Sequence, residues 1–191
     1  MSDELVGYFG FGSLVNRNTL RTSYVDLVQA SLKGYSRHWQ SKTKTLEEQV
    51  ALLSIHPDQT CEIYGMIVLD KLENLPLVDA REQGYSRHRL NRDQLLIDSD
   101  AAMPNDIYVY IANEPEGESD EGALLQSYLD AVMQGFFNEY GDEGVRHFMD
   151  TTKGFDRKLI RDRQSPKYPR PVMLSDSDAT YFDSLVGPAT R

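Results

Sequence analysis

The order of strand-like and helix-like segments most constrains the fold of this chain. Short apolar stretches typical of β-strands fill most of the chain before Ala112, and the clearest helical pattern begins only at Gly122. Strands first and helices afterwards indicate an α+β fold with a mostly antiparallel sheet or barrel. A doubly wound sheet would need regular βαβ alternation, which the sequence does not show.

Individual elements are predicted from periodicity and from flanking glycine and proline. Strands are expected at residues 5–9, 24–39, 50–55, 61–69, 85–90, 94–97 and 106–112, with a turn at Pro57-Asp58 joining the third and fourth. A short helix is expected at 75–83, with Pro76 in its first turn and Gly84 as its stop.

The C-terminal third is expected to be helical, apart from one basic segment. A wide apolar stripe predicts a helix over 122–140, with Asp120 as its cap and Gly141 as its stop. A shorter helix is expected at 143–150, and a last one opens at the capping-box-like pair Ser175 and Asp178. Between residues 153 and 170 lie seven cations and two anions. Pro166 and Pro169 lie within this segment and Pro171 directly follows it, so the segment is expected to be extended.

Length and composition limit the class of protein. With 191 residues we expect a single domain over 1–191, ending in the basic extended segment and helix of 153–191. The sequence contains no run of about 18 apolar residues, so it predicts no membrane span. The acidic start and the single Cys61 favour the cytoplasm, because they fit neither a secretory signal nor an intrachain disulfide. A net charge of −10 argues against general binding to nucleic acid or anionic membrane.

A glycine-rich turn follows the first predicted strand and reads Phe9-Gly10-Phe11-Gly12-Ser13-Leu14. Glycine lets another group approach the main chain closely, and successive exposed N–H groups can form a nest for an anion. Val15 stands where a dinucleotide fingerprint needs its third glycine, and Ser13 lacks the flanking glycines of a nucleophile elbow. The turn therefore predicts main-chain anion binding rather than a phosphate-cofactor site or a covalent serine.

One acidic residue, Glu82, stands at the end of the short predicted helix, just before Gly84-Tyr85. A helix C-terminus carries partial negative charge, a setting that suits a carboxylate acting as general base near neutral pH. A surface glutamate paired with Arg81 or Arg87 is the alternative. The four histidines show no metal-ligand spacing, so we expect no metal.

The glycine turn of Phe9 to Leu14, Glu82 before Gly84-Tyr85, a tyrosine-containing strand and a long helix follow one another over roughly residues 5–140. In this order they resemble the gamma-glutamylcyclotransferase-like superfamily, which includes the ChaC enzymes and the gamma-glutamylamine cyclotransferases. The resemblance implies a small mixed, mostly antiparallel β-barrel flanked by helices. It also implies an intramolecular reaction that releases 5-oxoproline and a free amine from a gamma-glutamyl substrate without any cofactor.

The resemblance assigns roles to particular residues. Glu82 matches the catalytic acid of the family, and the turn at Phe11, Gly12, Ser13 and Leu14 would hold the gamma-glutamyl group through main-chain N–H groups. Tyr110 is similar in place to a tyrosine that contacts the substrate. The common tyrosine of the turn is Phe11 here, so any role of that hydroxyl would be lost or would be supplied by Tyr8 or Tyr110.

Several questions stay open at this stage. A non-catalytic module that binds a small carboxylate on the same scaffold is the alternative function, and a protein partner for the basic segment of 153–170 is a third. That segment could fold over the site or form a structural tail, and we expect the tail. The sequence fixes neither the gamma-glutamyl substrate nor the oligomeric state, and a homodimer remains open.

Overall fold

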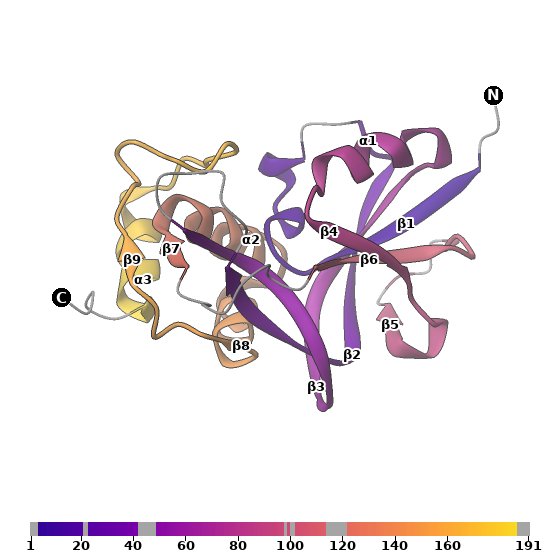
Figure 1. Ribbon diagram of the computed structural model, residues 1–191, viewed down its shortest axis with the longest axis horizontal. Helices are drawn as coiled ribbons and strands as arrows, with labels where there is room; N and C mark the ends of the chain where they lie inside the picture. The colour runs from indigo at the N-terminus through magenta and orange to yellow at the C-terminus, as the bar shows by residue number, and fades with distance from the viewer. Residues whose placement is uncertain are drawn as a thin grey trace.

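The computed structural model describes residues 4–20, 23–41, 49–97, 99, 102–113 and 122–186 (Figure 1). Its α-helices are α1 (Leu75–Arg81), α2 (Gln126–Asp150) and α3 (Asp176–Val186), and its 3-10 turns are η1 (Ser13–Val15), η2 (Arg17–Thr19), η3 (Leu72–Asn74) and η4 (Arg92–Gln94). Its strands are β1 (Leu5–Gly10), β2 (Asp26–Ser41), β3 (Val50–Lys71), β4 (Tyr85–Arg89), β5 (Leu95–Ile97), β6 (Ile107–Ala112), β7 (Ala123–Leu125), β8 (Thr152–Lys153) and β9 (Leu159–Ile160).

One mixed sheet organises the described chain. Its main strands lie in the order β4-β6-β1-β3-β2-β5, and β1 with β6 is the one parallel pair among these neighbours. The expected α+β class with a mostly antiparallel sheet is therefore confirmed. The end strands β4 and β5 do not pair with each other in the described residues, so the sheet stays open where we expected a barrel.

The predicted turn at Pro57-Asp58 is wrong. β3 runs without a break from Val50 to Lys71 and pairs with β2 along both halves, with a register shift between Lys33 and Tyr35. Gly34 adopts a φ of +83° at this shift, and Pro57 lies opposite Tyr35. A bulge tolerates proline because a donor is not needed there, so the chain bends without leaving the sheet.

The long helix begins later than its apolar pattern indicates. Ala123–Leu125 form the strand β7, which runs parallel to β3 and β9, and α2 starts only at Gln126. The expected cap, Asp120, lies outside the described residues. Gly141 has φ 67° and ψ −157° inside α2, so the predicted helix end there appears as a kink between two helical parts. No helix in the described ranges combines the length and apolar character needed to cross a bilayer.

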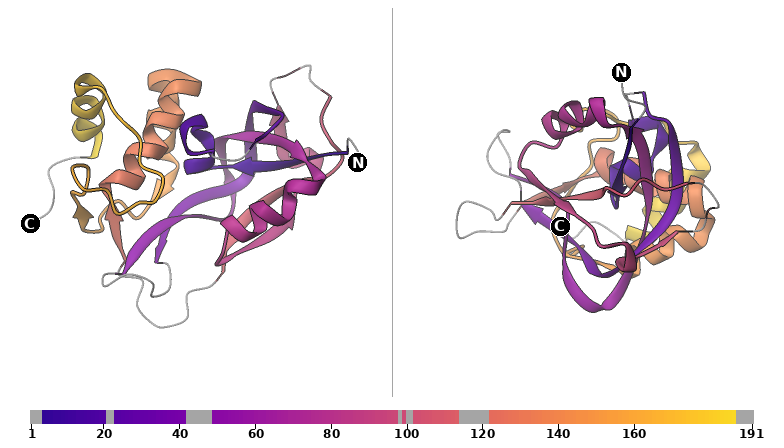
Figure 2. Two further views of the ribbon diagram at one scale, coloured as in Figure 1. Left: turned by 90° about the horizontal axis from the view of Figure 1, so that it is seen from above. Right: turned by 90° about the vertical axis from the view of Figure 1, so that its right-hand side faces the viewer.

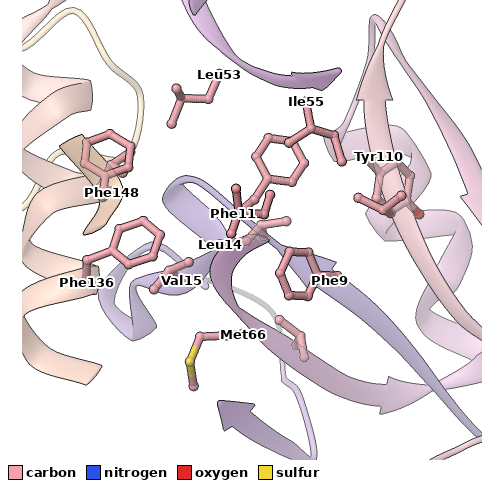
Figure 3. Packing of buried hydrophobic residues seen from close by; sticks show 14 of the residues in the cluster. Phe9, Phe11, Leu14, Val15, Leu53, Ile55, Met66, Tyr110, Phe136 and Phe148 are labelled. Carbon is pink, nitrogen blue, oxygen red and sulfur yellow. The ribbon is translucent and has the colours of Figure 1, made fainter. Parts of the chain in front are cut away.

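The three helices lie at different places around the sheet (Figures 1 and 2). α2 and α3 lie together at one end of the molecule, whereas α1 lies beside β1, β4 and β6. The rings of Phe137 and Phe182 join α2 to α3, with centroids 6.0 Å apart. Figure 3 shows how the core connects these parts, with Phe136 and Phe148 of α2 on one side, Tyr110 of β6 on the other and Phe11 between them.

Candidate functional site

The glycine-rich turn lies directly after β1 and packs too tightly for larger residues. A Cβ on Gly10 would lie 2.6 Å from the Cβ of Leu14. A Cβ on Gly12 would lie 3.1 Å from the Tyr128 hydroxyl oxygen and 3.2 Å from Leu53 Cδ1. Gly10 therefore lets the turn fold back onto Leu14, and Gly12 lets the backbone lie directly against β3 and α2.

The turn leaves three successive N–H groups available. The N–H groups of Val15 and Asn16 donate to the carbonyls of Gly12 and Ser13, at 3.0 and 3.1 Å. Those of Gly12, Ser13 and Leu14 donate to no acceptor in the part of the chain that the structure describes. These are the main-chain groups that the sequence predicted as an anion cradle.

A buried arginine fixes the first peptide group of this turn. Arg37 Nε donates to the Phe11 carbonyl at 2.8 Å, and no peptide bond in the described chain is cis. In a trans peptide the following N–H points opposite to the carbonyl. The Gly12 N–H is therefore directed away from Arg37, and Gly12 lines the cavity described below.

Glu82 follows the last residue of α1. Its N–H donates to the Val78 carbonyl, and two residues later Gly84 turns the chain with a φ of +85°. The Glu82 side chain is only 17% exposed, and its Oε1 lies 3.0 Å from Arg81 Nε. Arg87 pairs instead with Asp79, at 2.8 Å. Glu82 therefore pairs with Arg81, as the alternative of a surface glutamate predicted, but its side chain is not exposed as a surface glutamate would be.

Sheet topology brings Glu82 to the glycine turn. β1 runs parallel to β6, with Phe9 opposite Val109, and β4 runs antiparallel to β6, with Tyr85 opposite Ala112. The end of β1 and the start of β4 therefore meet at the same edge of the sheet. The glycine turn directly follows the end of β1, and Glu82 lies three residues before Tyr85 at the start of β4.

All the residues predicted for the site line one cavity. Its lining consists of Phe9, Phe11, Gly12, Ser13, Leu14, Leu53, Glu82, Tyr85, Tyr110 and Tyr128. Figure 3 shows Phe11 near the centre of these residues, with Leu53 above it, Leu14 below it and Tyr110 to one side. The cavity has a volume of about 40 Å³, whereas ligand pockets usually have roughly 300–1,000 Å³. A bound ligand would therefore have to displace some of the lining side chains.

Tyr110 lies at the cavity, but its hydroxyl is engaged. It donates to Asp79 Oδ1 at 2.7 Å, and its ring packs edge-on against Tyr8 with centroids 6.5 Å apart. Burial, followed by the Asp79 carboxylate, raises the pKa of Tyr110. The ring can contact a ligand, while the hydroxyl is held toward α1.

Sequence reasoning missed two further tyrosines of this cavity. Tyr85 donates to the Leu53 carbonyl at 3.0 Å, and Tyr128 lies on the apolar stripe of α2 beside Gly12. Burial is the main cause that raises the pKa of both phenols, so they stay protonated at neutral pH. A tyrosine directly after Gly84 and a hydroxyl on an otherwise apolar stripe were the signals that could have identified them.

A larger cavity of about 460 Å³ lies elsewhere, between β2, β5 and α2. Its lining comprises Gln29, Ala30, Ser31, Tyr64, Leu96, Ile97, Tyr140 and Glu143, and includes none of the predicted site residues. Within the described ranges, no group of three or more His, Cys, Asp and Glu side chains could hold a metal ion. The smaller cavity is therefore the candidate site, because it joins an acidic residue to unpaired main-chain N–H groups.

Comparison by sequence gives no match: no family model fits the chain, and no curated protein is similar to it. Solved structures do match. A structure described as gamma-glutamyl cyclotransferase superposes with a TM-score of 0.60 at 16% identity, over 94% of this chain and 98% of that one. The structure of an uncharacterized protein from Homo sapiens superposes with a TM-score of 0.56 at 14% identity, over 94% of this chain and 98% of that one.

A third structure, YkqA from Bacillus subtilis, gives a TM-score of 0.54 at 17% identity and covers 78% of this chain. The match takes up 56% of the YkqA chain. The first two superpositions extend over 94% of this chain, and all three have TM-scores above 0.5. The chain therefore has the gamma-glutamylcyclotransferase-like fold.

Proposed function

We propose that the protein is a cyclotransferase that converts a gamma-glutamyl peptide or amine to 5-oxoproline and a free amine. The observation that carries the proposal is that Glu82 lines the same cavity as Gly12, Ser13 and Leu14, whose N–H groups donate to no acceptor among the described residues. The fold shared with a structure described as gamma-glutamyl cyclotransferase supports the same reaction class.

The reaction needs a base and a site for negative charge. Glu82 takes a proton from the α-amine of the glutamyl group, whose nitrogen then attacks the γ-carbonyl carbon. The γ-oxygen becomes negative, and the free N–H groups of the turn are suitable donors to it. The bond from the γ-carbon to the leaving nitrogen then breaks, and Glu82 returns the proton to that nitrogen.

The substrate carries both reacting groups, so the enzyme needs no second reactant and holds the substrate in the cyclising shape. Because the cavity measures about 40 Å³, binding must first open it. Phe11 supplies no hydroxyl, Tyr8 is buried and Tyr110 donates to Asp79. Proton transfer in this proposal therefore rests on Glu82.

The test is release of 5-oxoproline by the purified protein from glutathione, gamma-glutamyl amino acids and gamma-glutamyl amines, measured by mass spectrometry. Glu82→Gln keeps the side-chain volume and should reduce turnover about 10²- to 10⁴-fold, the usual contribution of a general base. Glu73→Gln removes the same charge at an exposed position just before α1 and should be without effect.

Two results would contradict the proposal: no 5-oxoproline from any of these substrates, or unchanged turnover in Glu82→Gln. Stabilisation against heat by glutamate or 5-oxoproline, without turnover of any substrate, would instead support a non-catalytic module that binds a small carboxylate.

A further inference from the structure

The basic segment is built into the fold rather than trailing from it. Asp162 accepts hydrogen bonds from the N–H and hydroxyl of Ser127, at 2.8 and 2.6 Å, near the start of α2. It also accepts from the N–H of Lys167 at 2.9 Å. Arg163 pairs with Asp130 at 2.7 Å and with Asp183 at 2.8 Å. We expected a structural tail, but residues 162–167 of this segment are held against α2 and α3 by these contacts.

The anchored segment carries Tyr168 to the candidate site. Tyr168 is 6% exposed, and its N–H donates to the Ser127 hydroxyl at 3.2 Å. Its ring packs edge-on against Tyr128, which lines the cavity, with centroids 4.9 Å apart. The guanidinium of Arg170 lies 5.9 Å from the centre of the Tyr168 ring, within reach of a cation–π contact.

A second arginine, Arg81, pairs with Glu82 of the cavity, and its Nε lies 3.0 Å from the Glu82 carboxylate. The side chain of Arg81 is 14% exposed, and its buried Nη2 meets no acceptor among the described residues. Contacts tie both arginines to the cavity: Arg81 through Glu82, and Arg170 through Tyr168, which packs on Tyr128. Burial is the main cause that lowers the pKa of Arg81, and the charge of Arg170 lowers it further. Glu82 compensates only one of these two charges.

On the basis of the proposed function, we infer that Arg170 and Arg81 form a subsite for a carboxylate of the substrate, with Tyr168 positioning Arg170. A guanidinium presents its donors in a planar fork that fits a carboxylate, and the unpartnered Nη2 of Arg81 provides such a donor. A gamma-glutamyl substrate offers this group at two places. One is the α-carboxylate of the glutamyl part, and the other is the carboxylate of an amino acid that leaves.

The test compares kcat/KM for gamma-glutamylalanine, which has both carboxylates, and gamma-glutamylethylamide, which has only the first. Arg170→Gln should lower kcat/KM about 10- to 100-fold, as expected for loss of one charged hydrogen-bond donor. Loss with both substrates assigns the α-carboxylate, and loss with gamma-glutamylalanine alone assigns the leaving group. Lys158→Gln removes an exposed cation from the same segment and should change neither.

Values within twofold of wild type for Arg170→Gln on both substrates would overturn the subsite while leaving the proposed reaction standing. If the wild-type protein turned over neither these two substrates nor any other gamma-glutamyl compound, the proposed function would fail, and the subsite would be judged by calorimetric binding of 5-oxoproline, itself a carboxylate. Weaker binding by Arg170→Gln than by Lys158→Gln would then support the subsite. Equal binding, or none by the wild type, would refute it.

Discussion

Replacing Arg37 with methionine tests the link between the core and the glycine turn. Arg37 has no exposed surface, and its guanidinium donates to the Phe11 carbonyl at 2.8 Å, to Thr151 Oγ1 at 2.7 Å and to the Tyr64 carbonyl. It also lies over the rings of Phe136 and Phe148. No carboxylate among the described residues forms an ion pair with it, and burial lowers its pKa to about 9.

The expected loss follows from these contacts. Each hydrogen bond with a charged donor contributes about 1.5–3 kcal/mol, so the three together contribute about 5–9 kcal/mol. Methionine is uncharged, so the variant avoids the cost of burying the guanidinium charge. This offsets several kcal/mol of the loss. We therefore expect Arg37→Met to lower the free energy of unfolding by about 2–4 kcal/mol.

Urea unfolding followed by circular dichroism measures this change. With a slope of about 2 kcal/mol per molar urea, the midpoint should fall by about 1–2 M. Thr151→Val is the matched control for the turn, because it leaves the contact between Arg37 and Phe11 in place. It removes one acceptor of Arg37 and one donor to the His147 carbonyl, and by the same values it should cost about 2–4 kcal/mol.

Under the proposed function, Arg37→Met should also lose 5-oxoproline release at temperatures where it remains folded. Without Arg37 the Phe11 carbonyl would lose the donor that holds it, so the direction of the Gly12 N–H would no longer be fixed. Thr151→Val keeps this contact and should keep 5-oxoproline release. A loss of stability below about 1 kcal/mol in Arg37→Met would refute the argument that these hydrogen bonds outweigh the cost of burying the charge.

Two further changes test other buried polar groups. Burial, followed by the charge of Arg37, lowers the pKa of His147 below 6.5, so the unfolded chain binds the proton more readily. The free energy of unfolding should therefore fall as the pH drops from about 6.5 through the folded-state pKa, and it should fall less steeply in His147→Gln. If urea unfolding between about pH 7.5 and 5.5 gave the same pH dependence for the wild type and this variant, the argument would be contradicted. Asp162→Asn should cost about 2–3 kcal/mol in the same assay, because an amide replaces a buried carboxylate that accepts three hydrogen bonds. The exposed Asp156→Asn should stay within about 0.5 kcal/mol of wild type, and equal losses in the two variants would refute the anchoring role.

Local rules predicted several elements well. A short apolar run identified β1, alternating side chains identified β6, and Pro76 with Gly84 marked the short helix that became α1. Ser175 caps α3 by accepting from the N–H of Asp178 at 3.1 Å, as its sequence pattern indicates. These features depend on neighbours within a few residues, so the sequence specifies them directly.

Long-range pairing decided what local patterns could not. The two apolar runs around Pro57 became one strand because β2 pairs with both of them across a bulge. The first residues of the predicted long helix joined the sheet as β7 because β3 and β9 offered partners on both sides. The sheet order left β4 and β5 unpaired with each other, so no barrel closed among the described strands.

The candidate site divides in the same way. From the sequence came its two halves, the turn of Phe11 to Leu14 and Glu82, since glycine spacing and a helix end are local signals. That they line one cavity was decided by the parallel pairing of β1 with β6 and the antiparallel pairing of β4 with β6. The positions of Arg37 and Tyr168 were likewise tertiary results. No local pattern distinguishes a buried arginine from a solvated one, because burial depends on which distant segments pack around it.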